Sequence, residues 1–116
     1  MCCPDEHGPE QELANRLRRA FRRLLTDRGA DLSYGRKLPR LLRSAGLADV
    51  RAEAYFPVTS PACEVLEAAS VRHVREELLT AGLATAEEIE THLANLAAGG
   101  LDLMLAPMIT AWGRKA

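Results

Sequence analysis

The chain of 116 residues is poor in aromatic side chains, and this shortage limits the core that it can build. Phe, Trp and Tyr make up only 4% of the sequence, although 47% of its residues are hydrophobic. The apolar residues are mostly Ala and Leu, which favour helices over strands. A chain of this length has room for one domain with a modest core.

Long hydrophobic runs and disulfide patterns are also missing. Because the sequence has no run of about 18 apolar residues, it predicts no transmembrane helix. The start of the chain is acidic and contains no apolar signal region. The three cysteines, Cys2, Cys3 and Cys63, suggest no disulfide framework, so we expect a reducing compartment and a cytoplasmic protein.

The sequence also lacks a strong excess of one charge. Its net charge of -1 creates no overall field that would draw it to nucleic acid or to a membrane. The charges are nevertheless unevenly distributed. Residues 1–51 carry 11 Lys/Arg against 7 Asp/Glu, a balance of +4, and residues 52–116 carry 4 against 9, a balance of -5.

Motifs for metal binding or nucleophilic catalysis are absent. Cys2, Cys3 and His7 lie close together but lack the ligand spacing of a metal site. Cys63, near the start of a predicted helix, is expected to be a buried thiol. His73 and His92 fall on separate predicted helices without a partnering ligand, so we expect each in solvent or at the edge of the core.

Hydrophobic periodicity predicts a flexible tail over residues 1–9 and a single domain over residues 10–116. The predicted fold class is α+β, mostly helical, with a two-stranded antiparallel sheet. The predicted elements are a helix over 10–26, a helix over 35–45, a strand over 50–58, helices over 61–81 and 85–97, and a strand over 107–114.

Several local signals set these boundaries. Proline is tolerated only in the first turn of a helix, so Pro39 requires the second helix to begin near Arg36 or later. The strand over 50–58 alternates between apolar and polar residues and should be half-buried. Ser60 is the expected N-cap of the next helix. The residues expected to face the core from that helix are Val65, Leu66, Ala69, Val74 and Leu78. Thr85 and Glu88 have the spacing of a capping box.

The stretch Asp31–Val58 and the ending MITAWGRKA resemble the C-terminal third of a class I S-adenosylmethionine-dependent methyltransferase. GRKLPRLLRSAGLADV looks like the last helix of that fold and the start of its sixth strand, and VRAEAYFPV looks like the sixth strand. MITAWGRK looks like the seventh strand, and the helices over 61–97 look like a variable insertion between the two strands. The helix over 10–26 is similar to the cap helix of small-molecule enzymes related to those of the ubiquinone pathway.

The resemblance does not extend to the cofactor-binding half of that fold. Gly99 and Gly100 follow a helix, which is the wrong context for a cofactor-binding turn, and no acidic residue ends a second parallel strand. The resemblance therefore implies no catalytic or cofactor-binding residue in this chain, and S-adenosylmethionine only where a partner chain supplies its site. By analogy with caps of the family, the candidates for a substrate pocket are Phe21, Leu25, Tyr34 and Met104; ordinary core is the alternative role for all four.

The missing fifth strand of the family predicts a partner. Without it, the outer edge of the strand over 107–114 has unpaired N–H and C=O groups, and a two-stranded sheet alone is marginal. We expect a homodimer or a separate cofactor-binding chain at this edge, with a small-molecule acceptor possible.

Two other functions stay open. One is a dimeric interaction or ligand-binding module without transferase activity. The other is DNA binding through the arginine-rich segments 16–23 and 36–43. Nucleic-acid binding is less favoured, because the connection Thr26–Gly35 is long for a helix-turn-helix.

Overall fold

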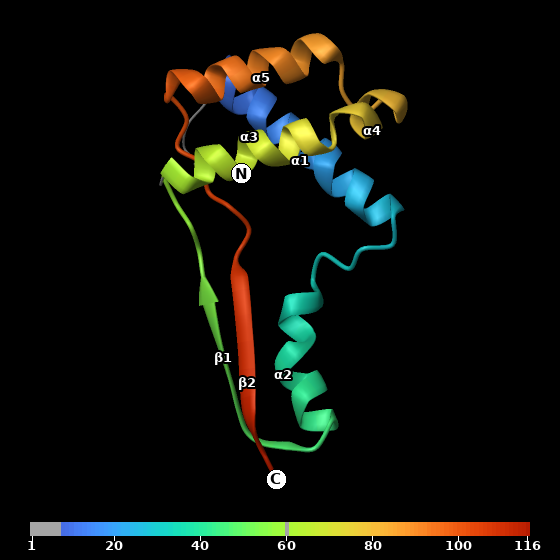
Figure 1. Ribbon diagram of the computed structural model, residues 1–116, viewed down its shortest axis with the longest axis vertical. Helices are drawn as coiled ribbons and strands as arrows, with labels where there is room; N and C mark the ends of the chain where they lie inside the picture. The colour runs from blue at the N-terminus through green and yellow to red at the C-terminus, as the bar shows by residue number, and fades with distance from the viewer. Residues whose placement is uncertain (1–7, 60) are drawn as a thin grey trace.

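The computed structural model describes residues 8–59 and 61–116. Its helices and strands form two groups, one purely helical and one that contains the sheet (Figure 1). The helical lobe, residues 8–29, 57–59 and 61–105, contains α1 (Pro9–Asp27), α3 (Pro61–His73), α4 (Arg75–Thr80) and α5 (Ala86–Ala98). The sheet lobe, residues 30–56 and 106–116, contains α2 (Tyr34–Ser44), β1 (Leu47–Tyr55) and β2 (Met108–Lys115). These elements confirm the predicted α+β class with a two-stranded antiparallel sheet.

The molecule is elongated, because the helical lobe lies across one end of the sheet lobe (Figure 1). Its principal extents are 54 × 29 × 22 Å, and its radius of gyration is 17.0 Å. A compact domain of this length would have a radius of gyration of about 13 Å. The packing of one lobe therefore contributes little to the other.

All the buried residues among those described lie in the helical lobe. One cluster, centred on Leu17, Leu78 and Ile89, joins α1, α4 and α5. A second cluster contains Cys63 and Leu103, which confirms the expected burial of the Cys63 thiol. In the sheet lobe no described residue is buried, and α2 has no buried residue at all.

Local capping signals predict the last helix well. Thr85 accepts a hydrogen bond from the Glu88 N–H at 3.2 Å, and the Glu88 carboxylate accepts one from the Thr85 N–H at 3.3 Å. At the other end Gly99 adopts a left-handed conformation with φ of 72°. Such a residue stops a helix without the steric penalty that a side chain would bring.

The second helix corrects the expectation that proline fixes its start. α2 begins at Tyr34, so Pro39 lies inside the helix instead of in its first turn. α2 also packs closely on the sheet, because Gly35 lets it approach β2. A Cβ added at Gly35 would lie 3.2 Å from the Ile109 side chain.

The first strand also differs from its predicted range of 50–58. β1 spans Leu47–Tyr55, pairing with β2 from Leu47↔Lys115 to Tyr55↔Met108. A bulge between Ala48 and Arg51 lets the ladder continue toward Leu47, and Asp49 takes a positive φ of 51° there. The expected half-buried side is not buried: Ala52 and Ala54 are both exposed.

The predicted helix over 61–81 is two helices. α3 ends at His73 and α4 begins at Arg75, with Val74 between them at φ of -102°. This break lets Val71, Val74 and Leu78 all join the cluster that α1 and α5 build. Ser60, the predicted N-cap of this segment, lies outside the described residues.

The chain passes between the lobes three times, and two of these connections lie side by side; the third is the link from α1 to α2 (Figure 1). We call the two connections that lie side by side the neck: residues 57–59 and 103–105. The Thr59 N–H donates to the Leu103 carbonyl at 2.8 Å, and the Leu105 N–H donates to the Pro57 carbonyl at 3.0 Å. The neck continues the antiparallel course of β1 and β2 into the helical lobe.

Candidate functional site

A buried chain of polar side chains joins three helices to the neck. Arg18 on α1 donates to the Glu67 carboxylate on α3 at 3.0 Å and to the Met104 carbonyl of the neck at 2.7 Å. The second oxygen of Glu67 lies 3.3 Å from Nε2 of His92 on α5. This chain fixes the neck to the helical lobe through Arg18.

The position of Glu67 reverses the predicted orientation of α3. Glu67 follows Cys63 by four residues and precedes Val71 by four, so all three lie on the buried stripe of the helix. Val65 and Leu66, expected to face the core, are 70% and 54% exposed. The one signal for this site in the sequence was the position of Glu67, a charged residue four positions from each of the apolar residues Cys63 and Val71.

Burial and hydrogen bonding act in opposite directions on Glu67. Burial alone would raise the pKa of the Glu67 carboxyl, but the hydrogen bond with His92 and the charge and hydrogen bond of Arg18 outweigh it. The pKa of Glu67 therefore lies below its usual value, and the carboxylate is ionised at neutral pH. Since an ionised carboxylate only accepts, Nε2 of His92 is the donor in their hydrogen bond.

His92 is fully buried, which corrects its expected place in solvent or at the edge of the core. Its Nδ1 has no hydrogen-bond partner among the described residues. With Glu67 only 7% exposed as well, neither group can reach a ligand in solvent. The chain of polar groups therefore holds the three helices and the neck together.

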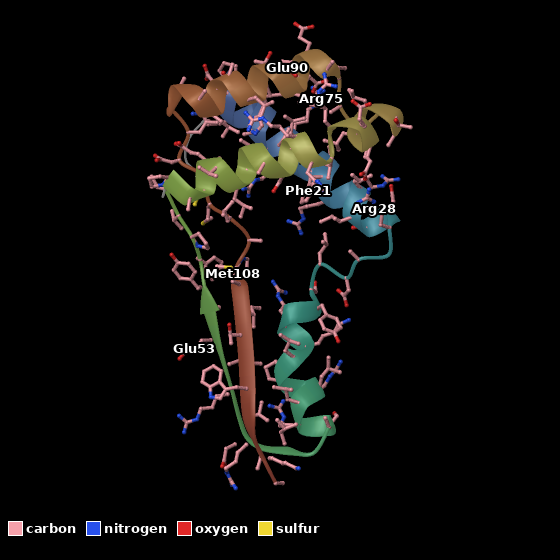
Figure 2. All side chains as sticks on the ribbon, in the orientation of Figure 1. Phe21, Arg28, Glu53, Arg75, Glu90 and Met108 are labelled. Carbon is pink, nitrogen blue, oxygen red and sulfur yellow. The ribbon has the colours of Figure 1, made fainter. Side chains whose placement is uncertain are left out.

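The four predicted pocket residues occupy different surroundings. Phe21 packs against the cluster of α1, α4 and α5, and Leu25 is half-buried on the last turn of α1. Tyr34, the first residue of α2, is 54% exposed, and Met104 belongs to the neck. Figure 2 places Phe21 in the helical lobe and Met108 at the end of β2 nearest to that lobe.

Two hollows on the surface include none of these four residues. The first is formed by α1, and its lining residues are Pro9, Glu12, Leu13, Asn15, Arg16 and Arg19. The second lies at the bulge of the sheet, and its lining residues are Asp49, Arg51, Trp112, Gly113 and Arg114. A substrate pocket at Phe21, Leu25, Tyr34 and Met104 stays a prediction.

One face of the sheet is uncovered. The pairing of Arg51 with Trp112, of Glu53 with Thr110 and of Tyr55 with Met108 places these six residues, which we call the open face, on the same side. All six are exposed, with Tyr55 at 63%, Met108 at 57% and Trp112 at 42%. The opposite side bears Ile109, against which α2 packs.

The outer face of α2 is basic. Arg36, Arg40 and Arg43 follow each other at four- and three-residue steps, so they share one side of the helix. All three are exposed, and none forms an ion pair with an acidic residue that the structure describes. Lys37 instead pairs with Asp31, whose pKa is lowered mainly by that hydrogen bond.

The structure shows neither a metal site nor a membrane span in its described part. No group of three or more His, Cys, Asp or Glu residues within 8–59 and 61–116 could hold a metal ion. Cys2, Cys3 and His7, considered above for a metal, lie outside those ranges. Across the same ranges, no helix combines the length and the apolar character needed to cross a bilayer.

Comparison with known proteins adds no relative. No family model, no curated protein and no solved structure matches this chain.

Proposed function

We propose that this chain is the substrate-cap and C-terminal part of an S-adenosylmethionine-dependent methyltransferase of class I. It is not catalytic alone and acts with a cofactor-binding chain, which supplies the site for S-adenosylmethionine. Its acceptor is a small molecule, and its compartment is the cytoplasm. The three cysteines, an odd number with two of them adjacent, suggest no disulfide framework, which supports a reducing compartment.

The arrangement of the sheet lobe carries this proposal. α2 packs on one side of an antiparallel pair of strands, and a helical insertion, α3 to α5, separates the two strands in the sequence. This is the order in which the family that the sequence resembles closes its sheet. The sheet has two strands among the described residues, so each strand has one edge free to pair with another strand.

The cofactor-binding chain would extend the sheet at the outer edge of β2. Methyl transfer depends on holding the cofactor in line with the acceptor, and little acid–base chemistry is needed. The helical lobe is then the cap over the acceptor. Its candidate lining is Phe21, Leu25 and Met104, and Tyr34 of the sheet lobe is the fourth candidate. The buried chain of Arg18, Glu67 and His92 supports this role, because it fixes the neck between cap and sheet.

A module without transferase activity is the second candidate. The exposure of Tyr55, Met108 and Trp112 favours it, since an uncovered apolar face is typical of an interaction surface. DNA binding is the third, and Arg36, Arg40 and Arg43 are the residues that would carry it. Such binding would weaken steeply with salt, because basic residues displace counterions from the phosphates.

Calorimetry with S-adenosylmethionine tests the proposal. We expect no heat of binding from this chain alone. The chain is then co-expressed with the cofactor-binding half of a class I small-molecule methyltransferase, truncated after its fifth strand. The two should co-purify, and the cofactor should bind at least tenfold more tightly to the pair than to the cofactor-binding half by itself.

Two outcomes contradict the proposal. Micromolar binding by the chain alone would mean that it holds a cofactor site of its own. Failure of the two pieces to associate, with the cofactor-binding half shown to be folded, would leave the interaction module as the better account. Salt-dependent binding of duplex DNA by the chain alone would favour the third candidate.

A further inference from the structure

The outer face of α2 carries arginines that no acidic side chain neutralises. Arg36, Arg40 and Arg43, which we call the basic stripe, are all exposed. None of the three forms an ion pair with an acidic residue that the structure describes. α2 itself contains no Asp or Glu, so its own turns supply no partner for them. The basic stripe is therefore a charged surface open to another molecule.

The arginines of α1 are used differently. Arg16 and Arg18 form ion pairs with glutamates of α5 and α3, and Arg23 pairs with an aspartate on the next turn of α1. Much of the charge of the first arginine-rich segment is thus neutralised inside the helical lobe. The charge of the second segment, on α2, is not.

The acidic residues of the sheet lobe cannot neutralise the basic stripe. The lobe, residues 30–56 and 106–116, has 7 Lys/Arg against 3 Asp/Glu, a balance of +4. Of its three acidic residues, Asp31 pairs with Lys37 and Asp49 pairs with Arg114. The third, Glu53, belongs to the open face, on the side of the sheet away from α2.

α2 gains stability when this charge is neutralised. Like charges at three- and four-residue steps destabilise a helix, because the side chains lie next to each other on its surface. Gly35 and Pro39 lower the helix propensity of α2 further, and none of its residues is buried. A molecule that brings carboxylates to the basic stripe removes the repulsion between its arginines.

We propose that the basic stripe of α2 binds an acidic helix of another protein. The Cα atoms of Arg36 and Arg43 are about 10 Å apart along the helix axis, at 1.5 Å per residue. Glutamates at the same four- and three-residue steps of a second helix form a row of equal length. Three carboxylates can therefore meet the three guanidinium groups when the two helices lie side by side.

An apolar residue borders the basic stripe. Leu41 follows Arg40 in the sequence and is 38% exposed. The partner helix is thus expected to carry an apolar side chain next to its row of carboxylates. Arginine is enriched in protein interfaces, where its long side chain also covers apolar area. The contact is small and polar, which is typical of a weak and transient complex.

The number of free arginines favours a protein over nucleic acid or a membrane. A protein that binds duplex DNA through its backbone can make about 6–10 phosphate contacts, and polybasic segments that bind anionic membranes contain about 4–8 Lys/Arg. The basic stripe has only three arginines, and the net charge of -1 adds no attraction for a polyanion. A helix with three carboxylates matches these arginines one for one.

Fluorescence anisotropy with a synthetic helix tests the proposal on the full chain. The probe is a labelled, alanine-rich peptide with three glutamates at four- and three-residue steps and a leucine beside them. We expect it to bind about tenfold more tightly than its glutamine counterpart at about 0.05 M salt. The dissociation constant should rise at least threefold by about 0.5 M salt. Equal binding of the two peptides, or no binding at about 500 µM chain, would overturn the proposal.

Matched variants locate the surface. Arg40→Glu with Arg43→Glu reverses two charges of the basic stripe and should weaken binding of the glutamate peptide at least tenfold. Arg19→Glu with Arg22→Glu makes the same change at exposed positions of α1 with the same three-residue spacing, and it should leave binding unchanged. Circular dichroism confirms that both variants remain folded. Equal weakening by the two pairs of substitutions would contradict the assignment to α2.

A peptide with reversed charge provides the complementary test. With lysine in place of its three glutamates, the peptide should bind the variant with Arg40→Glu and Arg43→Glu more tightly than it binds the wild type. Loss of both peptides by that variant would mean that the substitutions damage α2, and the paired-charge contact would then be rejected.

Two other polyanions complete the experiment. A duplex DNA of about 20 base pairs and vesicles that contain phosphatidylserine are titrated at the same salt concentration. We expect both to bind more weakly than the glutamate peptide. Tighter binding of either one, abolished by Arg40→Glu with Arg43→Glu, would assign the basic stripe to that ligand and overturn the proposal.

The acidic helix does not rest on the proposed function. The basic stripe lies on α2, whereas a cofactor-binding chain would pair with the edge of β2. Failure of the peptide to bind would leave the calorimetric result with S-adenosylmethionine unchanged. A failed reconstitution with a cofactor-binding half would equally leave the peptide result intact.

Discussion

The two lobes of this molecule show opposite ways of holding a fold. The helical lobe contains all the buried residues that the structure describes, and its polar chain of Arg18, Glu67 and His92 is enclosed by helices. The sheet lobe has a regular strand ladder and a packed helix, yet none of its described residues is buried. Hydrogen-bonded secondary structure therefore does not by itself provide a core.

The largest expected difference comes from truncating one leucine in each lobe, a buried one in the helical lobe and a half-buried one in the sheet lobe. Leu78, 1% exposed, lies in the cluster of the helical lobe, and Leu78→Ala should lower the free energy of unfolding by about 3–4 kcal/mol. Leu42→Ala, at a half-buried position of α2, should cost about 1 kcal/mol because less area is lost. Urea unfolding followed by circular dichroism measures both values.

Trp112 makes the comparison between the lobes sharper. It is the only tryptophan and lies on β2, so its fluorescence reports on the sheet lobe. Most helical residues belong to the other lobe, so dichroism at the helix band reports mainly on that lobe. We expect the fluorescence transition at lower urea than the dichroism transition. Coincident transitions would mean that the lobes unfold together.

The third prediction concerns the buried carboxylate of the helical lobe. Glu67→Gln leaves the Arg18 charge without its partner and should lower the free energy of unfolding by about 2–3 kcal/mol at neutral pH. Glu87→Gln, at an exposed position of α5, is the matched control and should have little effect.

The pH dependence of that difference has a definite sign. Because the pKa of Glu67 is lower in the folded chain than its usual value of 4.5, ionised Glu67 stabilises the folded state above that value. This contribution is lost as the pH falls through the folded-state pKa. The gap between wild type and Glu67→Gln should therefore shrink below about pH 4.5. Urea unfolding from pH 7 to pH 3 measures it, and a constant gap would contradict the assigned ion pair.

The smallest difference between two matched variants is expected for the glycine at the bulge of the sheet lobe. A Cβ at Gly113 would lie 3.1 Å from the Leu47 side chain and 3.2 Å from the Ala48 carbonyl oxygen. Gly113→Ala should therefore cost about 1–2 kcal/mol and move the Trp112 fluorescence transition to lower urea. Gly100→Ala is the control in the helical lobe, since nothing lies within 4 Å of its added Cβ. Equal stability of the two variants would mean that the bulge adapts.

The sequence predicted the boundaries of helices and strands better than it predicted which of their sides are buried. The helix over 85–97 appears as Ala86–Ala98 with its capping box, and the strand over 107–114 appears as Met108–Lys115. Such features depend on residues a few positions apart. The predicted buried side of α3 was wrong, because the spacing of Val65 and Leu66 fits a buried stripe as well as the spacing of Cys63 and Val71 does. Only the position of the Arg18 and His92 side chains makes Glu67 the residue that turns inward.

The candidate site was only partly accessible from the sequence. The open edge of the sheet followed from the missing strand of the resembled family, but the open face did not. It required the register that pairs Tyr55 with Met108 and Arg51 with Trp112, and that register includes a bulge that the alternating pattern did not reveal. The chain Arg18–Glu67–His92 joins residues 49 and 25 positions apart, beyond the range of any local pattern.

The sequence by itself determined the composition of the core, the ends of α5 and the α+β class, since these depend on propensity, capping and short-range periodicity. The tertiary structure decided which side of α3 is buried, where α2 begins, and that the molecule separates into two lobes. Each of these depends on free energies of contact between segments far apart in the chain. Such contacts override local preference wherever two faces of a helix are equally apolar.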